Sequence, residues 1–398
     1  MLKKSRATPI EETIPALRLG FRIFFPAAAS FSIIALITWV GVLSQTWRFE
    51  PYGGAYWWHA HEMLFGFVTA AIAGFLLTAV QSWTGLPGLK GSRLLLLLTL
   101  WLSARLLFFF NIGSDSWWPS IIDIAFLPTT AVLLALPIIR AGKYRNLLFI
   151  PILLLMSLSN LSMHAAIHTH DPAWLPIGSH AMLMLVTMLM CILGGRVFPM
   201  FTANGTQTKK VLPLPKLEML SLSIMAIIVI IFVFAITLPK PVMAGLFLIA
   251  ALAHFFRWLR WRFWITLKTP LVWSLHIAYL CIPLGLLLFS FYYMGFLPSF
   301  SLALHTITVG AMGSMILAMM SRVSLGHTGQ MLRSSPLITS AFFLMLLALL
   351  FRTLGTIIGG DNMPALIISA VLWCGAYGLF LIRYLPLLTR AREDGRPG

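Results

Sequence analysis

Two histidines and a glutamate begin a long apolar segment in the first quarter of the chain. They are His59, His61 and Glu62, and the apolar segment continues to about Trp83. Ionisable side chains are costly inside a bilayer, so those that occur there generally serve a function. Imidazole is also the commonest metal ligand in proteins. This stretch therefore predicts a functional site that binds a metal or handles protons.

Other histidines are expected at the same membrane depth, because they also lie at the outer ends of apolar segments. His164 and His168 are four residues apart, so both point from one helical face and can hold a small ion such as copper. His59 and His61 are two positions apart in the sequence. This spacing corresponds to about 200° on a regular helix, so the two rings should face different neighbours. The remaining histidines at this depth are His170, His180 and His305.

His305 stands alone and is followed by small residues. Small residues let a flat macrocycle or another helix come close, so this pattern suits either an axial haem ligand or plain helix packing. On the inner side, Arg322 and His327 belong to a segment with two glycines. That segment can hold an anionic group such as a haem propionate, or simply end a helix.

Two acids are expected to be buried, and each needs a partner. Glu62 can orient a ligating histidine, relay protons as a catalytic group, or pair with Arg48, Arg105 or Arg352. Asp123 is expected to meet Arg105 near the outer end of its segment.

The elements that must position these residues are membrane spans. The chain has 398 residues, of which 59% are hydrophobic and only 10% are charged. A spanning helix needs about 20 consecutive apolar residues. The sequence therefore predicts an all-α polytopic membrane protein with about 12 spans in a single domain covering residues 1–398. The expected spans are 20–44, 58–82, 92–112, 117–140, 146–169, 173–195, 216–238, 241–260, 270–294, 298–321, 336–358 and 364–388.

The formal net charge of +17 follows the topology and does not indicate nucleic-acid binding. Almost all Lys and Arg residues fall on alternate connections, whereas the other connections carry only Arg48 and Lys240. This positive-inside pattern predicts that both termini are cytoplasmic, with 1–19 as an N-terminal segment and 389–398 as a tail. No cleavable signal peptide is expected. The lipid bilayer is the expected environment.

Two further features carry little functional signal. Cys191, Cys281 and Cys374 fall within apolar spans and form no CxxC, so they are expected to be packing residues without disulfides. No internal repeat is evident in the sequence.

Several stretches together resemble the NnrS family of bacterial inner-membrane proteins. The last of them is very specific, and the likeness spans nearly the whole chain. The matching stretches are Trp58–Gly66, Ala71–Val80 with Trp83–Gly85, Gly194–Thr202, Leu275–Tyr279 and His305–Gly313 running on to Arg322–Gly329.

The resemblance implies a membrane protein with haem and copper that acts in the response to nitric oxide and nitrosative stress. It maps the histidines of the family's motifs onto His59, His61, His276, His305 and His327. His276 is an outlier, because the topology places it in the inner half of its span. The pair His164 and His168 lies outside these motifs, so its assignment to copper comes from spacing alone.

Three functions are therefore weighed. The first is a redox or gas-handling metalloprotein in which a span-2 histidine and His305 hold haem b. In this metalloprotein, copper is held by His164, His168 and one more histidine, for which His180 is the candidate. Nitric oxide would reach the site through lipid, and a quinol or redox protein would supply electrons to an oxidoreductase. The second is a transporter of copper or haem that uses the same histidines. The third is an accessory protein without turnover.

Overall fold

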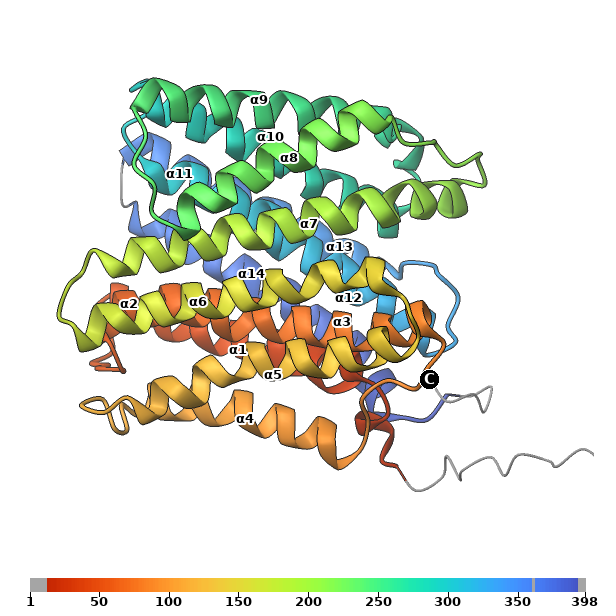
Figure 1. The fold of residues 1–398 in the computed structure, drawn as a ribbon, viewed down its shortest axis with the longest axis horizontal. Coiled ribbons are helices and arrows are strands. Elements are labelled where there is room, and N and C mark those ends of the chain that lie inside the picture. Colours follow the sequence, from red (N-terminus) through yellow and green to blue (C-terminus); the bar gives the residue numbers. More distant parts are fainter. Residues whose placement is uncertain (1–12, 360–361, 393–398) are drawn as a thin grey trace, which may run out of the picture.

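The structure, a computed structural model, describes residues 13–359 and 362–392. These residues form helices and no strand, and 12 helical segments are long and apolar enough to cross a membrane (Figure 1). The all-α fold with 12 spans is thus confirmed, while the membrane orientation remains a prediction. Residues 1–12 and 393–398 of the expected terminal segments lie outside the described residues.

The spans are α1 (Gly20–Leu43), α2–η3–α3 (Gly54–His61, Glu62–Val68, Thr69–Thr84), α4 (Ser92–Phe109), α5 (Trp118–Arg140), α6 (Phe149–His168), α7 (Trp174–Thr206), α8 (Pro215–Val233), α9 (Lys240–Arg260), α10 (Pro270–Tyr293), α11–η6–α12 (Phe300–His305, Thr306–Gly313, Ser314–His327), α13 (Pro336–Gly359) and α14 (Met363–Thr389).

The first and last spans lie side by side and bring both described ends to one side of the helix bundle (Figure 1). Arg22 in α1 is buried and donates through Nη1 to the carbonyl oxygens of Leu388 at 3.0 Å and Arg390 at 2.7 Å. We name this side the terminal face and the other side the opposite face. The charge pattern predicts that the terminal face is cytoplasmic.

Four spans form the centre of the bundle. The second, sixth, ninth and tenth spans bury 72, 72, 72 and 67% of their most apolar windows, whereas the other spans bury 28 to 50%. The second, sixth and tenth spans also contact one another, through η3 with α7, η6 with α7, and α3 with α12. The motif histidines of these spans therefore belong to the interior and not to the lipid surface.

Two of these central spans share a local feature that the sequence did not reveal. A π-helical segment follows directly after His61, and another follows directly after His305. In both spans a glycine stands five residues after the histidine, at Gly66 and Gly310. A Cβ at either glycine would collide with a neighbouring span. Because π segments in α-helices occur mostly at functional sites, both histidines gain weight as functional residues.

Two spans extend well beyond their predicted ends. α7 continues to Thr206 instead of ending at 195, and the tenth span continues to His327 instead of ending at 321. The predicted end of α7 falls at Gly194 and Gly195, which serve close packing within the helix. A Cβ at Gly194 would lie 3.0 Å from the ring of Tyr279, and one at Gly195 would overlap the guanidinium of Arg257. The three cysteines are free, as expected.

The close approach of α6 and α7 depends on a single glycine and gives a test of the packing. A Cβ at Gly178 would lie 2.5 Å from the carbonyl oxygen of Ser159 and 2.9 Å from the amide nitrogen of Met163, both backbone atoms that cannot step aside. We expect Gly178→Ala to destabilise the protein by about 1 to 3 kcal/mol through overpacking. Thermal unfolding midpoints of the purified protein in detergent measure this effect.

Gly245→Ala is the matched control, because Gly245 is also helical and has nothing within 4 Å of the added Cβ. It should leave the midpoint unchanged or raise it, since alanine is favoured over glycine within a helix by about 1 kcal/mol. Equal midpoints for the two variants would contradict the packing of α6 on α7.

Candidate metal centre

A network of charged side chains from three spans lies buried near the opposite face. Glu62 comes from η3, Arg105 from α4 and Asp123 from α5, and none of them is more than 5% exposed. Arg105 forms an ion pair with Asp123, as the sequence predicted, and its Nη1 lies 3.2 Å from Oε1 of Glu62. A buried charge is tolerated when it is paired, so this arginine accounts for both acids entering the bilayer.

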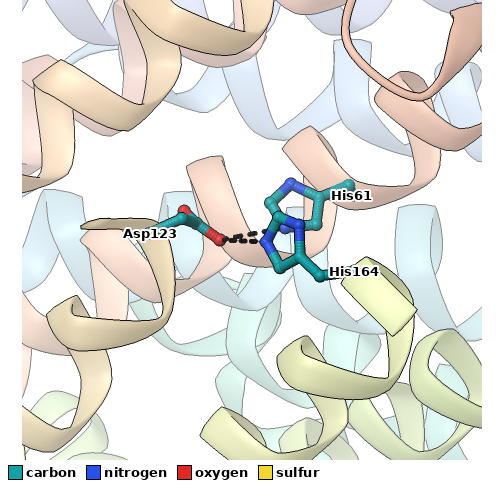
Figure 2. A group of neighbouring side chains, drawn as sticks. All are labelled: His61, Asp123 and His164. Carbon is teal, nitrogen blue, oxygen red and sulfur yellow. Dashed lines mark hydrogen bonds and ion pairs between the residues drawn. The ribbon is translucent and has the colours of Figure 1, made fainter. Parts of the chain in front are cut away.

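Two imidazole rings converge on one oxygen of Asp123 (Figure 2). Nε2 of His61 and Nε2 of His164 each lie 3.1 Å from Oδ2 of Asp123. The three ligand atoms lie within 4.8 Å of one another, and all three residues are buried. Two imidazoles and a carboxylate are a donor set that suits zinc, copper or iron.

Asn160 ties this group together. Its Nδ2 donates to Oδ2 of Asp123 at 2.6 Å, and its Oδ1 lies 2.8 Å from Nε2 of His61. Ligand atoms about 2.1 Å from one metal ion lie roughly 3.0 to 3.4 Å apart. The distance of 3.1 Å from each histidine nitrogen to Oδ2 fits such an ion, which would replace the contact of His61 with Asn160.

Electrostatics also favour an added positive charge. One guanidinium and two carboxylates leave the network with one excess negative charge, which a bound cation or a proton on His61 balances. Glu62 orients His61 through Oε1, which lies 2.9 Å from Nδ1 of the ring. A carboxylate behind a ligating imidazole fixes its tautomer and raises its basicity. The other oxygen of Glu62 is buried and has no hydrogen-bond partner among the described residues, so it can accept a proton.

Tyr52 extends the network toward the opposite face. Its hydroxyl lies 3.4 Å from Nδ1 of His164, 3.0 Å from Nε2 of His168 and 2.8 Å from Oγ of Ser120. Burial raises the pKa of Tyr52 to about 12, so the hydroxyl keeps its proton at neutral pH and can donate it to a histidine. His168 is half-buried and stacks on Trp117 with ring centroids 3.9 Å apart. It therefore lies between the buried group and the exterior.

A second group joins the second and tenth spans. His59 stacks on Trp39 with ring centroids 4.3 Å apart, and its Nδ1 is buried without a hydrogen-bond partner. His59, His305 and Arg352 interact electrostatically with one another. Nδ1 of His305 donates to the carbonyl oxygen of Ser301 at 2.8 Å, so the lone pair of the ring is on Nε2, 3.2 Å from Nη2 of Arg352.

The outer histidines thus form two groups and not one. His61 and His164 share the first group, with His168 attached through Tyr52, and His59 and His305 share the second. His180 lies elsewhere and packs on Phe300 with ring centroids 4.4 Å apart.

The other predicted residues lie toward the terminal face. His276 is 2.8 Å from Oγ1 of Thr202 through Nε2, and its Nδ1 is buried without a partner among the described residues. His327 packs on Phe21. Arg322 lies 4.0 Å above the ring of Phe201.

Three contributors to the site were not recognised from the sequence. Asp123 was expected only as the partner of Arg105, and Asn160 and Tyr52 were not expected at all. A signal for Asn160 exists, because Asn160, His164 and His168 follow at intervals of four and share one face of α6. No comparable signal marks Tyr52, which precedes the span and reaches the site by folding back.

The charge network predicts a large cost for removing its only arginine. Arg105→Gln leaves two carboxylates buried without their cation, so we expect a loss of about 3 to 5 kcal/mol in unfolding free energy. Arg140→Gln removes an exposed arginine from α5 and should leave stability unchanged. The double variant Arg105→Gln/Asp123→Asn should recover part of the loss, because it removes one of the stranded charges. Chemical unfolding in detergent measures all three, and an Arg105→Gln variant as stable as Arg140→Gln would disprove the network.

Comparison with known proteins places this geometry in a family. The family model of the NnrS protein matches residues 15–392, which is nearly the whole chain. A search of curated proteins finds no match to this chain. Twelve apolar spans agree with this match over nearly the whole chain, which shows that the chain belongs to the NnrS protein family.

Proposed function

We propose that the protein is a metalloprotein of the bacterial inner membrane that acts in the response to nitric oxide and nitrosative stress. Family membership supports the biological setting. The observation that carries the chemistry is the convergence of His61 and His164 on one oxygen of Asp123 inside the bilayer. Copper is the ion proposed there, held by these three residues. Copper supplies one-electron redox chemistry when bound.

Burial favours a resident ion over a transported one. His61 and His164 are 0% exposed and Asp123 is 5% exposed, so the group is closed on all sides in this structure. A transit site must open to one face and then to the other. The transporter is therefore the weaker alternative, and labile metal content would favour it. Intact metal without turnover would favour the other alternative, an accessory protein.

The residues around the metal group are suited to moving a proton. The free oxygen of Glu62 lies next to His61, and Tyr52 connects His164 with the half-buried His168. We propose that Glu62 accepts a proton and that His168 and Tyr52 link the site to the opposite face. Any oxidoreductase activity would also need electrons from a quinol or a redox protein.

A haem b is proposed between His59 and His305. Each ring has a nitrogen that could hold the iron: Nδ1 of His59 has no hydrogen-bond partner among the described residues, and Nε2 of His305 carries the lone pair of its ring. Arg352, whose Nη2 lies 3.2 Å from Nε2 of His305, is the cation that would pair with a haem carboxylate. Arg322 stands 17 residues after His305, roughly 25 Å along the span, so it would not reach the same haem.

An apolar cavity gives a small gas a place in the interior of the bundle. The cavity encloses about 650 Å³, including its open part, and lies between the first, second, sixth and tenth spans. Its lining is wholly apolar and includes Val68, which follows His61 by seven residues, about 10 Å along the second span. Nitric oxide is an apolar gas that dissolves in lipid, and we propose that it reaches the metal group by this route.

Metal analysis of histidine variants tests the metal assignment. His61→Ala and His164→Ala should each lose the bound transition ion, because two remaining ligands do not hold it. His170→Ala is the matched control, since His170 is exposed at the end of the same helix as His164. Metal content per chain and, for copper, electron paramagnetic resonance report the result. Full metal content in both variants, with thermal midpoints showing that they are folded, rules out the site.

Absorbance spectra test the haem assignment separately. His59→Ala and His305→Ala should each lose or shift the Soret band of the purified protein, while His170→Ala should keep it. His61→Ala should lose the transition ion without losing the haem, because the two groups use different histidines. A Soret band that is unchanged in both His59→Ala and His305→Ala would refute the assignment.

A further inference from the structure

A polar cavity opens at the terminal face, away from both histidine groups. It encloses about 1140 Å³, including its open part, and is bounded by the end of α7, the start of α10, the end of the tenth span and the loop before α13. Its polar lining includes Thr206, Thr269 and Ser334. Their hydroxyls donate to the carbonyl oxygens of the backbone, so the donors that remain for an anion are the cations of the cavity. The apolar cavity of the bundle centre has no such groups.

The charges that line the cavity all have one sign. Lys268, Arg322 and Arg333 contribute three cations, and none of the described residues that line it is acidic. Lys268 and Arg333 are exposed, whereas Arg322 is only 6% exposed. Cations held together without an acid repel one another, so the arrangement favours an anion that joins them.

Arg322 supplies the strongest observation. Its guanidinium lies 4.0 Å above the ring of Phe201, and it makes no hydrogen bond or ion pair with another described residue. Its guanidinium nitrogens are not sealed by the protein, so the five N–H donors of this largely buried side chain can reach an acceptor in the cavity. Two other buried arginines do form ion pairs: Arg105 with Asp123, and Arg257 with Glu218. Arg322 instead borders the cavity.

A helix terminus adds to the same field. α10 has 24 residues and begins at Pro270 on the wall of the cavity, and its N-cap residue Thr269 makes no side-chain cap hydrogen bond. The positive end of the helix dipole favours a compact anion.

We propose that this cavity binds a phosphate group. Arg322 would form the buried half of the site as a bidentate donor, and Lys268 and Arg333 would close over the phosphate from the surface. The position at the ends of the spans suits the headgroup of an anionic lipid, and the opening equally admits a soluble phosphate compound. The cytoplasmic orientation expected for this face agrees with both sources.

The experiment uses the full chain and two surface cations whose removal does not disturb the core. Inorganic phosphate is titrated against the purified protein in a neutral detergent at constant ionic strength, with chloride as the balancing anion, and the thermal midpoint is followed. We expect phosphate to raise the midpoint of the wild type. In Lys268→Gln/Arg333→Gln the apparent affinity should fall at least about tenfold, because two charge-assisted contacts with the phosphate are lost. A tenfold change in Kd corresponds to about 1.4 kcal/mol.

Arg140→Gln/Lys143→Gln is the matched control, since it removes two exposed cations from the same face outside the cavity. It should bind phosphate as the wild type does. No phosphate effect in the wild type, or the same affinity in the two double variants, overturns the proposal.

A second arm separates the two sources of phosphate. The same proteins are compared in phosphatidylcholine nanodiscs with and without phosphatidylglycerol. A midpoint that rises with phosphatidylglycerol in the wild type but not in Lys268→Gln/Arg333→Gln identifies the lipid headgroup. A response to inorganic phosphate alone identifies a soluble ligand. Metal and haem content should not change in either variant, so the test is independent of the proposed function.

Discussion

The ion pair of Arg105 with Asp123 and its close contact with Glu62 are the interactions on which the histidine chemistry depends. Two carboxylates cannot remain in the interior of a bilayer bundle without a cation, and this guanidinium is the one that reaches both. With the acids held in place, Glu62 orients His61 and Asp123 faces both His61 and His164. The arginine thereby fixes three neighbouring spans relative to one another at the level of the candidate metal centre.

The sequence predicted the frame well because the frame depends on local properties. Hydropathy and the distribution of Lys and Arg predicted the 12 spans, and helix ends predicted the depth of each histidine. The pairing of Arg105 with Asp123 followed from the same depth argument. The predicted end of the sixth span at 195 was wrong, because Gly194 and Gly195 lie within a continuous helix and permit close packing there.

The grouping of the histidines could not be predicted, because it depends on which spans are neighbours. α6 packs beside α5, and this brings His164 to Asp123, whereas α7 carries His180 toward Phe300. Spacing predicted that His164 and His168 face the same way, and both do reach the hydroxyl of Tyr52. Spacing gave no information on the other partners of His164, which are Asp123 from α5 and His61 from the second span.

The two π-helical segments have a consequence for the direction of the side chains in their spans. A π segment holds one residue more than the α-helical path, so it rotates everything on one side of it by about 100°. The second and tenth spans each carry this rotation directly after a histidine. Residues before and after the segment therefore face neighbours that a continuous α-helix would not offer them. The same backbone feature presents imidazole in two electrostatic settings, beside carboxylates at His61 and beside a hydroxyl and an arginine at His305.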